Sequence, residues 1–281
     1  MMRLAFAVCL LTAAAPAQLR LFEAADLPAR NTAAAMLDFG LQAFAADHGH
    51  GGVARLRAAV ATAAECLPFG SAARAVADEL RRSHSRPASL AAAVADLRSD
   101  LRFEPVVEAE LPAGVPGFSV LEEVELRSYP TYRMVRTGMK GGSFGAFMPL
   151  FRHIESNEIA MTTPVQIDYR NDGDRLRQNS MAFLYGSTDI GKPGKDGSVE
   201  VVDVPAVTVL TIGARGYDQP GRIAELQQRL ESWLAANPEW QATGALRVMG
   251  YNSPTVGAAK RCYEVQIPVQ RTAKARLRES V

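Results

Sequence analysis

The second half of the chain contains the passage Phe144-Gly-Ala-Phe-Met-Pro-Leu-Phe-Arg-His-Ile-Glu-Ser-Asn157, which continues after one glutamate as Ile159-Ala-Met-Thr-Thr-Pro-Val165. In its first part, aromatic and aliphatic side chains recur every three or four residues, which predicts an amphipathic helix. Ser143 precedes this helix as the candidate N-cap, and Pro149 should bend or weaken it. Residues 165–169 then have the composition of a β-strand. The passage therefore predicts a helix that runs directly into a strand.

Strand signals surround this passage on both sides. Val124 and Leu126 alternate with charged residues, and Tyr263, Val265 and Ile267 alternate with polar residues near the end of the chain. An alternation with period two is typical of half-buried strands. Further strand signals lie at residues 132–137, 181–185, 199–203, 206–214 and 246–251. Asp172-Gly173 supplies the turn of a hairpin.

A second amphipathic helix follows later in the chain. Its apolar face consists of Ile223, Leu226, Leu230 and Trp233. Pro220 opens this helix and Asn237-Pro238 closes it. The order of strand pair, helix and strand pair thus occurs twice, at about 80-residue spacing, which indicates a structural duplication. We expect an α+β domain in which two similar halves form one mostly antiparallel sheet, with a helix covering each half.

Four pieces of this domain resemble the SOUL heme-binding protein family. The most specific is Met161-Thr-Thr-Pro-Val165 behind the aromatic helix, and the others, in chain order, are Val124-Glu-Leu-Arg-Ser-Tyr-Pro130, Gly250-Tyr-Asn-Ser-Pro254 and Lys260-Arg-Cys-Tyr-Glu-Val265. The resemblance covers roughly residues 117–270. It implies a distorted antiparallel β-barrel of two similar halves with two flanking helices, and a non-catalytic protein that binds or carries heme or a related tetrapyrrole reversibly.

The residues of the domain can be matched to what such a ligand needs. A porphyrin is a flat apolar disc with two carboxylates at one edge, so its site requires an apolar wall, cations at the rim and, optionally, an axial ligand. The candidate wall residues are Phe144, Phe147, Met148 and Phe151, and the candidate partners of the propionates are Arg152, Lys260 and Arg261. His153 is the only histidine after residue 117, which makes it the candidate metal ligand. For each of these residues, ordinary core packing or a solvated surface position is the alternative.

The region before this domain has a different composition. Alanine makes up roughly 30% of residues 31–100, a composition whose intrinsic preference is helical. We expect helices at residues 31–47, 53–65, 71–83 and 89–101, packed as a small bundle within residues 18–102. Because alanine buries little area, the bundle needs something to pack on, and a partner protein is one candidate. The proline-rich residues 103–116 read as an extended linker.

The two ends of the chain carry further signals. Residues 1–17 combine a basic start, an apolar stretch and Ala15-Pro16-Ala17, which is the pattern of a secretory signal peptide. We therefore expect export to the periplasm or the extracellular space, without a transmembrane segment. Residues 271–281 form a basic tail. Cys66 and Cys262 remain after cleavage, and the sequence leaves open whether they pair.

Charge and motif content disfavour other classes of function. The chain has 31 Lys plus Arg and 30 Asp plus Glu, so nothing favours a nucleic-acid backbone as partner. The domain has one histidine, too few for a multi-histidine metal site, and no motif identifies a catalytic triad. We expect no enzymatic activity. The alternatives to a tetrapyrrole binder are a protein-interaction scaffold without pigment and a sensor of another flat apolar molecule.

Overall fold

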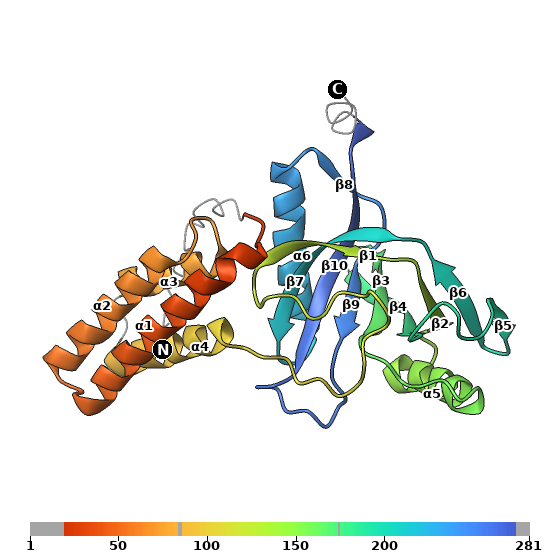
Figure 1. The fold of residues 1–281 in the computed structure, drawn as a ribbon, viewed down its shortest axis with the longest axis horizontal. Coiled ribbons are helices and arrows are strands. Elements are labelled where there is room, and N and C mark those ends of the chain that lie inside the picture. Colours follow the sequence, from red (N-terminus) through yellow and green to blue (C-terminus); the bar gives the residue numbers. More distant parts are fainter. Residues whose placement is uncertain (1–19, 84–85, 174, 274–281) are drawn as a thin grey trace, which may run out of the picture.

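The computed structural model describes residues 20–83, 86–173 and 175–273. The predicted signal peptide and residues 274–281 of the predicted tail lie outside them. The described chain consists of a helical bundle beside a sheet domain (Figure 1). No helix in the described ranges is both long enough and apolar enough to cross a membrane.

The bundle confirms the four predicted helices to within a few residues. It comprises a short 3₁₀ turn, η1 (Ala24–Asp26), and then α1 (Leu27–Ala46), α2 (His50–Cys66), α3 (Ala72–Arg82) and α4 (Pro87–Leu101). The first helix starts earlier than predicted because Pro28 fits the first turn, where no backbone N–H is needed. The small side chains allow close packing: a Cβ added to Gly40 of α1 would lie 2.5 Å from the Cβ of Ala59 of α2.

In the described residues, the sheet domain contains ten strands and two helices. The strands are β1 (Val124–Tyr129), β2 (Tyr132–Gly138), β3 (Val165–Asp172), β4 (Arg175–Leu184), β5 (Gly194–Asp196), β6 (Val199–Val204), β7 (Val207–Arg215), β8 (Trp240–Ala242), β9 (Arg247–Gly250) and β10 (Cys262–Arg271); the helices are α5 (Gly142–Ser156) and α6 (Pro220–Ala236). The short strands β5 and β8 were not predicted, because three residues are too few to show a period.

The domain has a first half, β1 to β4 with α5, and a second half, β6 to β10 with α6. The first strand of each half pairs with a strand of the other half. The sheet order is β1-β7-β10-β9-β3-β4-β2-β6-β5, with β8 pairing β10 beside this path, and every pairing is antiparallel. Strand β1 of the first half pairs with β7 of the second, whereas β6 of the second half pairs with β2 of the first. Between the described strands no ladder joins β1 to β5. The sheet is open, so the predicted closed barrel is not confirmed.

The sheet is nevertheless strongly curved. On one face, a buried network links Arg247 of β9 to Tyr132 of β2 through a hydrogen bond of 2.8 Å, although β3 and β4 lie between these strands in the sheet. Arg247 also donates to the side chain of Gln266 in β10, at 2.8 Å. The side chains meet because the face is concave.

Both helices of the domain cover the other face of the sheet. Helix α6 packs on a cluster that includes Leu210 and Val265, and α5 packs on a cluster that includes Val135 and Phe183; Ile167 of β3 touches both clusters. The concave face is covered instead by residues 103–118, which contribute Phe103, Val115 and Phe118 to the core and contain no helix or strand. The predicted linker thus runs along the sheet domain.

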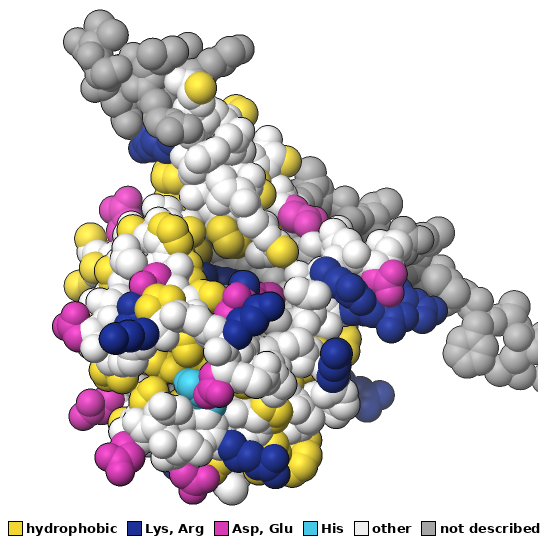
Figure 2. Space-filling view, turned by 90° about the vertical axis from the view of Figure 1, so that its right-hand side faces the viewer, with side chains coloured by type: hydrophobic (Ala, Val, Ile, Leu, Met, Phe, Trp, Pro, Cys, Tyr) yellow, Lys and Arg dark blue, Asp and Glu magenta, His cyan; other side chains and the backbone are white. Residues whose placement is uncertain are grey.

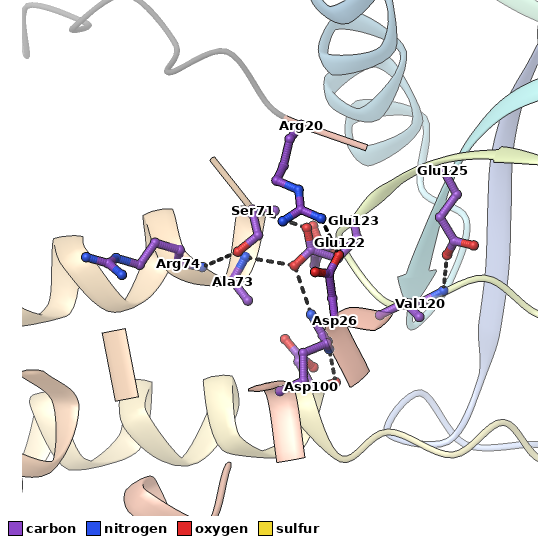
Figure 3. Close-up of polar contacts among 12 residues, drawn as sticks. Arg20, Asp26, Ser71, Ala73, Arg74, Asp100, Val120, Glu122, Glu123 and Glu125 are labelled. Atoms are coloured by element: carbon purple, nitrogen blue, oxygen red, sulfur yellow. Dashed lines mark hydrogen bonds and ion pairs between the residues drawn. The ribbon is translucent and has the colours of Figure 1, made fainter. Parts of the chain in front are cut away.

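A buried carboxylate joins the bundle to the sheet domain (Figure 3). Glu123 lies just before β1 and is 1% exposed. Its carboxylate accepts hydrogen bonds from Arg30 of α1 at 2.8 Å and from the backbone N–H groups of Ala72 and Ala73, at 2.8 and 3.1 Å, in the first turn of α3. The charge is therefore balanced by a guanidinium and by the positive end of a helix.

The neighbouring Glu122 holds α6. Its backbone is in the left-handed region, with φ of 66°, and its carboxylate accepts from Arg222 at 2.5 and 2.6 Å and from Arg229 at 2.7 Å. These arginines hold the pKa of Glu122 below its usual range, although burial opposes them. Two consecutive carboxylates thus bind the bundle and α6.

We predict that Glu123→Ala destabilises the protein by about 3 kcal/mol, because Arg30 would be left buried without its counter-charge. The measurement is urea unfolding of the protein. Glu200→Ala, which breaks the exposed pair with Arg136, is the matched control and should lose less than about 1 kcal/mol. Equal losses in the two variants would show that the buried carboxylate of Glu123 contributes no more stability than an exposed ion pair.

Candidate functional site

A cavity of about 990 Å³ lies on the helix-covered face of the sheet, between α5 and the strands β3, β9 and β10. Its wall is formed by Phe144, Phe147 and Met148 of α5. Its floor is formed by the side chains of Val165, Ile167, Met181, Val248 and Tyr263, together with Met161 in front of β3. The lining is mainly apolar and has the size of a small-molecule site.

The helix that forms the wall begins differently from the prediction. Gly141 is the N-cap, in the left-handed conformation with φ of 77°, and the helix starts at Gly142. The prediction of Ser143 as N-cap was wrong: Ser143 lies inside the first turn, where its hydroxyl contacts the side chain of Gln178 at 3.4 Å. Pro149 lies inside the helix, as predicted.

The Met161-Thr-Thr-Pro-Val165 segment shapes the floor. Thr162 donates to the carbonyl oxygen of Leu184 at 2.6 Å, and Thr163 donates to that of Tyr251 at 3.0 Å. The Thr163–Pro164 peptide bond is cis. The two hydroxyls tie the segment to β4 and to the loop after β9, while Met161 and Val165 line the cavity.

The mouth is built from loops. Glu108 accepts hydrogen bonds from the backbone N–H and the hydroxyl of Ser253, at 2.6 and 2.9 Å, which hold the pKa of Glu108 below its usual value. Arg261 donates to the carbonyl oxygen of Ser253 at 2.5 Å, and its guanidinium lies 5.3 Å from the ring centre of Tyr217. Asp218, just before α6, completes the charged groups of the lining.

The structure brings together four of the eight predicted site residues. Phe144, Phe147, Met148 and Arg261 line the cavity. Phe151 does not line it, but stacks on Phe147 with ring centres 5.8 Å apart. Arg152 and Lys260 are exposed and do not line it either. The predicted cations therefore do not converge on the cavity, apart from Arg261.

His153 lies on another side of α5. Its side chain is 8% exposed, with Nδ1 at 2.7 Å from the carboxylate of Asp196 in β5 and Nε2 at 2.8 Å from the hydroxyl of Tyr185. Both ring nitrogens are thus occupied, and neither faces the cavity lining. In this position the imidazole connects α5 to the sheet. Its predicted role as metal ligand stays a prediction, and the described residues contain no group of three or more His, Cys, Asp and Glu that would hold a metal ion.

Three groups of the lining were not predicted. Glu108 and Asp218 lie in loops outside any recognisable motif. Tyr263 was read as a strand residue, yet its buried hydroxyl has no hydrogen-bond partner among the described residues. Burial raises the pKa of Tyr263 to about 12, so this hydroxyl stays protonated at neutral pH. No signal in the sequence distinguishes such a tyrosine from an ordinary core residue.

The thiol of Cys262 offers a test of the lining. Burial raises its pKa to about 12, and both Cys262 and Cys66 are free. Because only the thiolate reacts, we predict that Cys262 is alkylated at pH 8 about a thousandfold more slowly in the folded protein than in urea. Peptide mass spectrometry measures the rate, with the partly exposed Cys66 as internal comparison. If Cys262 of the folded protein were alkylated as fast as in urea, its thiol would not be buried in the wall of the cavity.

Solved structures with a similar domain share little sequence with this chain. EcmrR in a DNA complex is 17% identical with a TM-score of 0.42, covering 53% of this chain and 58% of that chain. The isolated EcmrR C-terminal domain is 15% identical (TM-score 0.42, 53% and 98%), and a hydrolase from Listeria innocua is 11% identical (TM-score 0.41, 53% and 93%). This chain therefore spans 58% of the longer EcmrR chain.

At the level of sequence, the profile of the family described as SOUL heme-binding protein matches residues 115–268. The match includes α5, the Met161-Thr-Thr-Pro-Val165 segment and nearly all strands of the domain. No curated protein matches the chain significantly.

Proposed function

This chain belongs to the SOUL heme-binding protein family, and from that premise we propose that it reversibly binds heme or a related tetrapyrrole in the cavity between α5 and the sheet. The observation that carries the proposal is the cavity itself. Its volume of about 990 Å³ is at the upper end of the range for ligand pockets, and aromatic and thioether side chains dominate its wall. A large flat apolar ring is the class of ligand that fits such a lining.

The geometry also supports a mode of binding. Arg261 is the one arginine or lysine of the described lining, and is the candidate partner of a polar group at the edge of the ring. No described histidine lines the cavity, whereas the thioethers of Met148, Met161 and Met181 do. Methionine is a known axial ligand of heme iron. We propose that the ring is held mainly by apolar contact, with His153 outside the site.

The test of the function is a hemin titration of the mature chain followed by absorbance. We expect saturable one-to-one binding with a shifted Soret band. Phe144→Ala should weaken binding by about three- to tenfold, since Phe144 lines the cavity. Because Phe144 is 77% exposed, its loss should leave the fold intact. Phe39→Ala, which removes a 64% exposed ring from the bundle, is the matched control. Weak, non-saturating absorbance changes would reject the function.

His153→Ala separates the two modes of iron ligation. We predict that the variant keeps hemin affinity within about threefold and keeps the position of the Soret band, because the imidazole is bound to Asp196 and Tyr185. The absorbance spectra of wild type and variant, ferric and reduced, measure this. Loss of the shifted band, with an unchanged circular dichroism spectrum, would restore His153 as the ligand.

We further propose that the protein is a binder or carrier without catalytic activity and that it is exported. The first proposal is supported by the family and by the position of the single imidazole of the domain, whose ring nitrogens are engaged outside the cavity. The second rests on residues 1–17 alone.

A partner protein for residues 18–102 stays a prediction. The specific observation that favours a different flat ligand is the small number of cations at the mouth.

A further inference from the structure

The charges at the mouth of the cavity do not suit a ring with two free carboxylates. Of the described residues that line the cavity, Glu108, Asp218 and Arg261 carry the charges at neutral pH. Two are negative and one is positive, so the mouth has a net charge of −1. On the face that Figure 2 shows, basic side chains are likewise scattered between acidic ones.

The single positive charge is already engaged. Arg261 and Glu108 both bind Ser253, Arg261 at its carbonyl oxygen and Glu108 at its N–H and hydroxyl. The guanidinium also lies over the ring of Tyr217. Arg261 and Glu108 therefore largely compensate each other's charge, which leaves a ligand with few free donors.

Asp218 is the remaining charge of the lining. It is half-buried and forms no hydrogen bond or ion pair within the described part of the chain. Tyr263, another lining residue, is 2% exposed, its hydroxyl lacks a hydrogen-bond partner there, and the opposite charges of Arg222 and Asp218 both act on it. Next to the carboxylate of Asp218, an uncharged edge of a ring meets less repulsion than an ionised one.

We infer that the cavity favours a tetrapyrrole whose carboxylates are esterified or otherwise uncharged over the same ring with two free propionates. This inference rests on the proposed function and specifies its ligand. Asp218 acts as the residue that sets the preference, because its carboxylate repels an ionised edge of the ring. The apolar wall of α5 contacts both rings equally.

The experiment compares protoporphyrin, which has two free propionates, with its dimethyl ester. Both are titrated into the mature chain at low ionic strength, followed by porphyrin fluorescence. In the wild type, the ester should bind about tenfold more tightly. Asp218→Asn should tighten binding of the diacid about three- to tenfold and change that of the ester less than twofold. Asp172→Asn, in the exposed pair with Arg177 and outside the lining, is the matched control and should change neither.

The outcomes separate the inference from the function. If both rings bind saturably but the diacid binds as tightly as the ester, or Asp218→Asn leaves the diacid unchanged, the inference is overturned and the function stands. If neither ring binds saturably, both are rejected. If Asp218→Asn and Asp172→Asn increase the affinity for the diacid equally, the increase reflects the net charge of the protein alone, and the inference is also overturned.

Discussion

The arrangement of the chain depends on the buried carboxylate of Glu123. An ionised group that is 1% exposed must find compensating charge inside the protein, and here α1 supplies a guanidinium and α3 its first backbone N–H groups. The carboxylate comes from the residue in front of β1, so the bundle is fixed to the sheet at that edge. Glu122 fixes α6 to the same point. The alanine-rich bundle thus obtains from its own chain the support that its small apolar faces lack.

The local parts of the fold were predictable because their patterns are local. The four bundle helices follow from alanine content and breakers, and the long strands follow from period two. The wall of the cavity was also predictable, since Phe144, Phe147 and Met148 share one face of α5. Helix geometry contained one further signal. His153 lies nine residues after Phe144, which is two and a half turns, so the two side chains must point in opposite directions.

The mouth of the cavity could not be predicted, because its charges come from distant loops. Glu108 precedes the sheet, Asp218 precedes α6, and Arg261 precedes β10; only the folded chain brings the three to one cavity. The contacts of Glu123 with the bundle could not be predicted either. Nothing near Glu123 in the sequence distinguishes it from Glu122 and Glu125, and its partners lie 93, 51 and 50 residues away. Contacts between residues so far apart in the sequence produce no periodic pattern of residue types.

The pairing of each half's first strand with the other half has a consequence for how the domain folds. Val124 of β1 pairs with Ile212 of β7, and Tyr132 of β2 pairs with Val204 of β6, so neither half can complete its own sheet. Such ladders close long loops and are slow to form. A chain shortened before β7 would leave β1 without its partner. The two halves are therefore interdependent, and the domain should fold as one cooperative body only after its last strand is available.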